Sequence, residues 1–141
     1  MSSAKYKRVL LKLSGEALVG MKEYGIDDSF ITDLADQLIQ LHNKNVQLII
    51  VIGGGNFFRG SDLEKLGIQR VTADHMGMLA TVINSLALQS SIEKLNIECR
   101  VMSSITIDAV CEKYIKRKAE RHLEKNRIVI LAGGTGNPFF T

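Results

Sequence analysis

Three glycine-rich segments that follow apolar runs carry the strongest chemical signal in this 141-residue chain. They are Ser14-Gly15, Gly53 to Asn56 and Gly133 to Asn137. Glycine lets the main chain approach a ligand closely, and free backbone N–H groups in such loops suit an anion. One segment would be a weak signal, but three in one chain predict a site for several phosphate groups.

Two cations and a carboxylate lie beside or soon after these segments. Lys12 interrupts an apolar run, either as a strand lysine that reaches water or as the charge that neutralises a transferring phosphoryl group, and the neighbouring glycines favour the second. Arg59 is either a surface arginine or a fork of donors for a second phosphate. Asp74 could cap a helix, accept hydrogen bonds from sugar hydroxyls, or do both.

Several classes of protein are disfavoured. The Walker P-loop and the Rossmann glycine fingerprint are absent. A net charge of +3 is too small to indicate a nucleic-acid partner. Cys99 and Cys111 lack a metal-binding spacing, which favours reduced, structural thiols and no metal site. Without a signal peptide or a long apolar segment, we expect a cytoplasmic protein with no membrane association.

These residues must be positioned by alternating strands and helices. Apolar runs predict strands at residues 8–13, 46–52, 97–102 and 127–132. Helical spacing predicts a helix capped by Asp27 or Asp28 that reaches Leu41, another from Asp74 to about Leu95, and a charged, solvated one from Cys111 to Lys125. The alternation predicts an α/β fold whose mostly parallel sheet has helices on both faces, with ligands at the carboxyl ends of the strands.

Four longer motifs carry a family resemblance. Residues 10–18, 51–60, 74–81 and 134–141 resemble, in order and approximate spacing, the N-terminal part of the bacterial uridylate kinases of the amino acid kinase family. The resemblance implies a three-layer sandwich, truncated here. Residues 1–141 would be the nucleoside-monophosphate-binding part of a single domain, without the C-terminal half that holds the ATP base. It also implies transfer of the ATP γ-phosphoryl group to UMP in pyrimidine nucleotide biosynthesis, giving UDP and ADP, with Mg²⁺ accompanying ATP.

The resemblance also assigns roles to individual residues. Lys12 would be catalytic. The ATP side would comprise Lys12, Leu13, Ser14, Gly15, Gly55 and Arg59. The UMP side would comprise Gly54, Asp74, Thr135, Gly136, Asn137, Pro138, Phe139, Phe140 and Thr141. Relatives are commonly homohexamers activated by GTP, and the matching positions are Gly20, Gly25, Arg100 and Arg127, whereas Gln89, Ser90 and Glu93 replace charged or histidine contacts of some relatives.

Three alternatives remain open. An amino acid kinase that acts on a carboxylate or carbamate would share the first two glycine segments but not the motif at 134–141. A nucleotide-binding or storage protein could use the same fold without phosphoryl transfer. The chain could also be an inactive fragment, because missing sheet neighbours would expose apolar surface.

Overall fold

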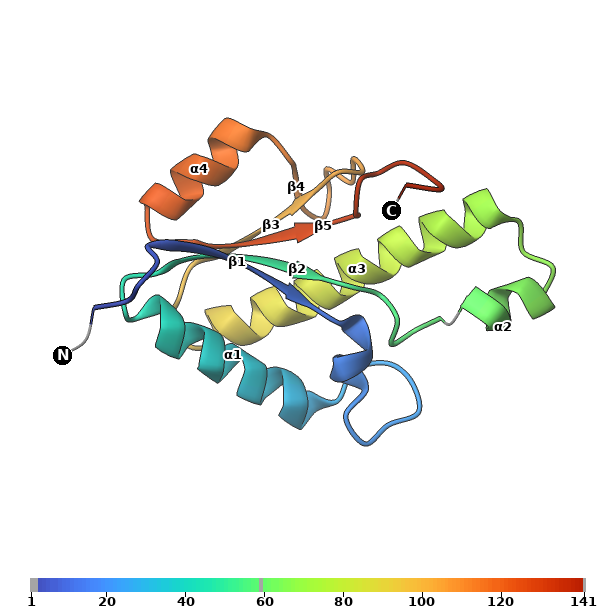
Figure 1. Cartoon of the computed structure of the whole chain (residues 1–141), viewed down its shortest axis with the longest axis horizontal. Helices are drawn as coiled ribbons and strands as arrows, with labels where there is room; N and C mark the ends of the chain where they lie inside the picture. Colours follow the sequence, from blue (N-terminus) through green and yellow to red (C-terminus); the bar gives the residue numbers. More distant parts are fainter. Residues whose placement is uncertain (1–2, 59, 141) are drawn as a thin grey trace.

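The computed structural model describes residues 3–58 and 60–140, which form one parallel sheet with helices on both faces (Figure 1). The sheet has five strands in the order β1-β2-β5-β3-β4. Their bounds are β1 Arg8–Leu13, β2 Gln47–Ile52, β3 Cys99–Ser103, β4 Glu112–Lys113 and β5 Ile128–Ala132. The predicted α/β class and parallel sheet are confirmed.

The apolar runs explain the strands. Leu48, Ile50 and Ile52 alternate along β2 and are almost fully buried, and β2 lies between β1 and β5, where β-branched side chains pack well. In the parallel register Lys12 lies beside Val51, one residue before each strand ends. The glycine segments after β1 and β2 therefore leave the sheet at the same edge.

The helices form two layers around the sheet. Their bounds are η1 Gly15–Val19, α1 Asp28–His42, α2 Gly60–Lys65, α3 Arg70–Glu93 and α4 Lys116–Glu124. Figure 1 shows α1 and α3 together beneath the sheet and α4 above it. The main core lies on the α1 and α3 side, while a smaller one joins α4 to the sheet through Ala119, Leu123, Met102 and Val129.

Asp27 caps α1 as one of the two predicted residues. Its carboxylate accepts hydrogen bonds from the Ser29 and Phe30 amides at 3.0 and 3.2 Å. Such a cap stabilises the start of the helix, because it gives acceptors to amides that have none within the helix. The Ser29 hydroxyl also donates to this carboxylate, at 2.7 Å, and this bond has the largest part in lowering the pKa of Asp27, with help from the amide bonds.

Two helix starts differ from the prediction. Helix α3 begins at Arg70, with Gln69 at the N-cap, so Asp74 lies in its second turn and does not cap it. The helix expected from Cys111 begins only at Lys116, because Glu112 and Lys113 pair with Met102 and Ser103 as β4. In the second case, pairing between strands decided a boundary that local residue types leave open.

Candidate functional site

A cavity of about 910 Å³ opens at the carboxyl ends of β1, β2 and β5. All three glycine segments and the N-terminal half of α3 contribute to its wall. The lining residues are Lys12, Leu13, Ser14, Gly15, Glu16, Val51, Ile52, Gly53, Gly54, Gly55, Ala73, Asp74, Gly77, Met78, Thr81, Leu131, Gly134, Thr135 and Phe140. The predicted convergence of three loops is thus observed.

The first loop brings one cation and a tight turn. Lys12 is exposed on β1 and forms no ion pair with any residue of 3–58 or 60–140. Ser14 caps η1 by accepting a hydrogen bond from the Glu16 amide at 3.3 Å. Gly15 lies so close to the second loop that a Cβ there would be 2.3 Å from the Gly53 carbonyl oxygen. Only glycine allows this contact between the loops.

The second loop leaves backbone donors open. The Gly53 amide donates to the Leu13 carbonyl, but no group in the described parts of the chain accepts from the Gly54 or Gly55 amide. Gly54 packs against α3, where a Cβ would be 2.8 Å from Cβ of Ala80. Two adjacent free N–H groups that line a cavity can bind an anion.

The third loop is fixed to α3 where it leaves β5. The Gly133 amide donates to Oγ1 of Thr81 at 2.8 Å, and the φ angle of Gly133 is 85°, a region that glycine enters without strain. Farther along, the Thr135 hydroxyl donates to the Phe140 carbonyl at 3.0 Å. The loop therefore curls back on itself at the mouth of the cavity.

Asp74 joins α3 to this third loop. Its carboxylate accepts a hydrogen bond from the Phe139 amide at 2.7 Å and from Nε of Arg70 at 3.1 Å. The Phe139 bond, assisted by Arg70, lowers the pKa of Asp74. The Arg70 guanidinium also lies 5.2 Å from the centre of the Phe139 ring. Asp74 is thus an ionised acceptor at the cavity wall.

The expected ligand residues fall into three groups. Lys12, Leu13, Ser14, Gly15, Gly54, Gly55, Asp74, Thr135 and Phe140 line the cavity, and Gly136, Asn137, Pro138 and Phe139 lie in its third loop outside the lining. Arg59 and Thr141 lie outside the described residues.

The four residues expected to bind GTP lie at two ends of the sheet within one chain. Gly20 and Gly25 lie between η1 and α1, at the carboxyl end of the sheet. Arg100 is the second residue of β3, and Arg127 immediately precedes β5. Because the strands are parallel, the two arginines lie at the opposite, amino end of the sheet.

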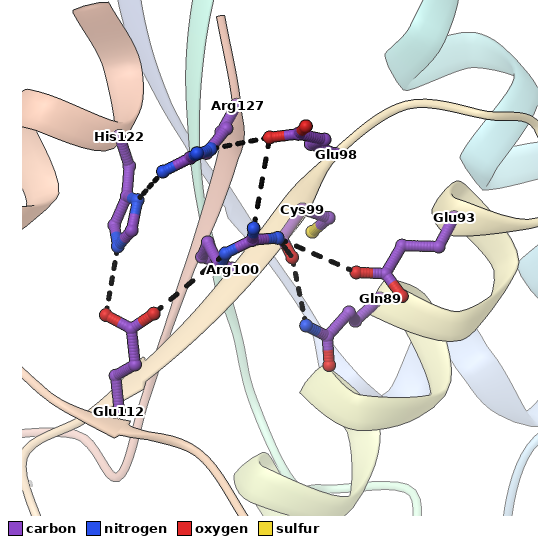
Figure 2. A network of polar contacts seen from close by, with 8 residues as sticks. All are labelled: Gln89, Glu93, Glu98, Cys99, Arg100, Glu112, His122 and Arg127. Atoms are coloured by element: carbon purple, nitrogen blue, oxygen red, sulfur yellow. Dashed lines mark hydrogen bonds and ion pairs between the residues drawn. The ribbon is translucent and has the colours of Figure 1, made fainter. Parts of the chain in front are cut away.

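Figure 2 shows that Arg100 lies among carboxylates. Its guanidinium is within 4.0 Å of Glu93, Glu98 and Glu112, and it donates to the Cys99 carbonyl at 3.1 Å. The arginine thus joins the end of α3 to β3 and β4.

Arg127 and His122 complete the same network (Figure 2). Nε of Arg127 donates to Glu98 at 2.6 Å, and its Nη1 lies 3.1 Å from Nδ1 of His122. Since a guanidinium can only donate, Nδ1 accepts, and Nε2–H of His122 donates to Glu112 at 2.9 Å. Both arginines are therefore held by groups of the chain itself.

Eight cavity residues outside the three glycine segments had not been predicted as site residues: Glu16, Val51, Ile52, Ala73, Gly77, Met78, Thr81 and Leu131. Helical spacing could have found three of them, because Ala73, Gly77 and Thr81 follow one another at intervals of four on the face of α3 that also carries Asp74. Cys99 offers no further chemistry, since burial raises the pKa of its thiol to about 12.

No helix in the described residues is long and apolar enough to span a membrane. The fold and the cavity define an α/β protein with a pocket at the carboxyl edge of a parallel sheet, lined by a lysine and by loop amides that have no acceptor in the described residues.

Comparison with known proteins makes this class specific. A sequence model of the amino acid kinase family matches residues 7–139, so the chain belongs to the amino acid kinase family. Uridylate kinase of Dichelobacter nodosus is 55% identical over 137 residues, covering 97% of this chain and 57% of that protein. Uridylate kinase of Xanthomonas axonopodis pv. citri is 59% identical over 141 residues, covering 100% of this chain and 59% of that protein.

Solved structures agree with the sequence matches. UMP kinase from Bacillus anthracis superposes with a TM-score of 0.92 at 44% identity, covering 96% of this chain and 56% of that one. UMP kinase from Ureaplasma parvum superposes with a TM-score of 0.91 at 37% identity, covering 99% of this chain and 59% of that one. The chain therefore spans somewhat more than half the length of the relatives it matches.

Proposed function

We propose that the protein containing this chain phosphorylates UMP, with ATP as the donor and UDP and ADP as the products. The observation that carries the proposal is the cavity at the carboxyl edge, which is lined by Lys12 and by Gly54 and Gly55, whose amides have no acceptor in the described residues. The similarity of the chain to two uridylate kinases, at 55% and 59% identity, supports UMP as the acceptor.

The proposed roles follow the two sides of the cavity. Residues Lys12, Leu13, Ser14, Gly15 and Gly55, with Arg59, would bind the phosphates of ATP. Residues Gly54, Asp74 and 135–141 would bind UMP, with the Asp74 carboxylate as acceptor for the hydroxyls of the ribose. The lowered pKa of Asp74 supports this role, because an ionised carboxylate only accepts hydrogen bonds.

The proposed reaction is an in-line transfer. A phosphate oxygen of UMP forms a bond to the γ-phosphorus while the bond to the bridging oxygen breaks, and ADP leaves with that electron pair. The loop amides would hold the two nucleotides in line, and Lys12 would offset the charge that develops on the transferring group. No general base is required.

Mg²⁺ would enter with the phosphates of ATP. The described residues contain no group of three or more His, Cys, Asp and Glu side chains that could hold a metal ion. In this proposal the ion is bound chiefly by substrate phosphates and water, and Glu16 is a carboxylate in the same cavity-lining segment as Lys12. Such an ion would neutralise charge between the donor phosphates.

Further proposals concern the protein in its cell. Pyrimidine nucleotide biosynthesis is the proposed pathway, and the cytoplasm is the proposed location, where the free thiols of Cys99 and Cys111 would stay reduced.

A homohexamer is the proposed oligomeric state, and the molar mass measured by light scattering would test it. GTP activation through Gly20, Gly25, Arg100 and Arg127 is a further proposal. Rates of UDP formation with and without GTP would test it, and an unchanged rate would contradict it.

The deciding experiment measures ADP formation by the protein as its gene encodes it, with ATP, Mg²⁺ and each candidate acceptor. UMP should give the highest kcat/KM. Turnover of only a carboxylate or carbamate would contradict the proposal. If calorimetry showed UMP binding without any transfer, a binding or storage role would replace it.

A further inference from the structure

Two asparagine side chains form a buried pair behind the second glycine loop. Asn56 is 2% exposed and Asn84 is fully buried. Nδ2 of Asn84 donates to Oδ1 of Asn56 at 2.7 Å, and Nδ2 of Asn56 donates to Oδ1 of Asn84 at 2.9 Å. The pair joins a residue of α3 to the loop that follows β2.

The remaining amide hydrogens of the pair go to two backbone carbonyls. Nδ2 of Asn84 also donates to the Gly53 carbonyl at 2.7 Å, and Nδ2 of Asn56 donates to the Gly25 carbonyl at 2.9 Å. In return, the Gly25 amide donates to the Asn56 carbonyl at 2.8 Å. All four amide hydrogens are therefore used, which fixes the orientation of both side chains.

These bonds connect three segments that are distant in sequence. Through Asn84, α3 holds the Gly53 carbonyl, and through Asn56 the loop holds the segment before α1. The Gly53 carbonyl is thereby committed to α3, while the next two amides, of Gly54 and Gly55, remain without an acceptor in the described residues. A buried pair with every hydrogen bond made favours one loop conformation, because a single lost partner would leave a buried group unsatisfied.

We propose that Asn56 and Asn84 are positioning residues that hold the amides of Gly54 and Gly55 toward bound nucleotide phosphates and couple this loop to the segment around Gly25. The proposal rests on the proposed function for its catalytic consequence. Its structural consequence is independent of any substrate. Neither asparagine lines the cavity, so both act through the loop.

The test uses Asn84→Ser in the protein as its gene encodes it, because a serine side chain is too short to make all of these bonds. Ser85→Ala is the matched control, since Ser85 is also fully buried on α3 but donates to the Thr81 carbonyl and not to the loop. Asn56→Ser provides a second variant if Asn84→Ser does not fold.

Amide hydrogen exchange is the first readout. The Gly25, Gly53 and Phe57 amides are hydrogen-bonded in or beside the loop, and the Ile128 amide reports on the other end of the sheet. In Asn84→Ser, exchange at the three loop amides should rise by about tenfold or more, with Ile128 unchanged. Unchanged loop exchange, or an equal rise in Ser85→Ala, would overturn the proposal.

Steady-state kinetics below the melting temperature is the second readout. Misplaced amides should lower kcat/KM by roughly tenfold to a hundredfold in Asn84→Ser, with Ser85→Ala close to wild type. Faster exchange with an unchanged kcat/KM would refute a positioning role. If the wild-type protein itself failed to phosphorylate UMP, the proposed function would fall, while the exchange data would still decide whether the pair holds the loop.

Discussion

The basic side chains at the two ends of the sheet differ in whether carboxylates of the chain pair with them. At the carboxyl end, Lys12 has no carboxylate partner in the described residues, and the amides of Gly54 and Gly55 have no acceptor there. At the amino end, Arg100 and Arg127 are each held by glutamates (Figure 2). The comparison separates cations that the carboxylates of this chain already hold from a cation that they leave open.

The amino-end network has a structural explanation. It joins Glu93 of α3, Arg100 of β3, Glu112 of β4 and His122 of α4, so it links both helix layers to the sheet. Three glutamates accompany two arginines and a histidine whose Nδ1 accepts a hydrogen bond. An anionic ligand at Arg100 or Arg127 would have to compete with these carboxylates, whereas Lys12 has no ion-pair partner in the described residues.

Replacing Lys12 should give the largest effect. Lys12→Ala is expected to reduce turnover by roughly a hundredfold or more, because it removes the charge proposed to stabilise the transferring group, while UMP binding is retained. Arg8→Ala is the matched control, since Arg8 is an exposed cation four residues earlier on the same face of β1. Steady-state kinetics would measure both. Equal losses of turnover in the two variants would contradict a specific role of Lys12 at the carboxyl end of the sheet.

Gly15→Ala tests the close contact between the first two loops. A Cβ at this position would be 2.3 Å from the Gly53 carbonyl oxygen, so the backbone must move, at a cost of about 1–3 kcal/mol in the free energy of unfolding. Gly77→Ala, in α3 with no atom within 4 Å of its Cβ, should instead gain about 0.5–1 kcal/mol. Urea denaturation would compare them. Equal stability of the two variants would contradict the observed contact.

Asp74→Asn tests the carboxylate at the cavity wall. The variant should raise KM for UMP by about fivefold to tenfold with little change in kcat, because hydrogen bonds to a charged acceptor are stronger than those to a neutral one. His75→Gln, at the next position of α3, is the control and should leave KM unchanged. A loss confined to kcat would place Asp74 in the chemical step rather than in UMP binding.

Glu98→Gln should give the smallest effect, at the amino end. The hydrogen bond from Arg127 lowers the pKa of Glu98 below its ordinary value of 4.5. The ionised carboxylate therefore stabilises the fold fully above that value, and the contribution is lost as the pH falls through the lower, folded-state pKa. Melting temperatures should differ from wild type near neutral pH and converge in strong acid. A difference that grows toward acid would show the opposite sign of coupling.

Sequence patterns predicted the strands and the meeting of the loops well. Continuous apolar runs such as residues 46–52 identify buried strands, and parallel strands bring their following loops to one edge. The start of α3 carried no such signal, since Gln69 makes no side-chain capping bond. The short strand β4 exists only through its pairing with Met102 and Ser103.

Sequence patterns also could not predict the Asn56–Asn84 pair or the Gly15–Gly53 contact. Each asparagine alone is typical of a surface residue, and its burial depends on a partner 28 residues away. The approach of Gly15 to Gly53 depends on how two loops leave the sheet, which no local spacing specifies.

A titration with UMP, followed by the backbone amide signals in NMR spectra of the protein, tests the central claim most directly. The amides of Gly54, Gly55 and Gly134 should shift saturably, because they line the cavity, while those of Arg100 and Glu112 should stay in place. Saturable shifts at Arg100 and Glu112, with unmoved glycine amides, would contradict the account.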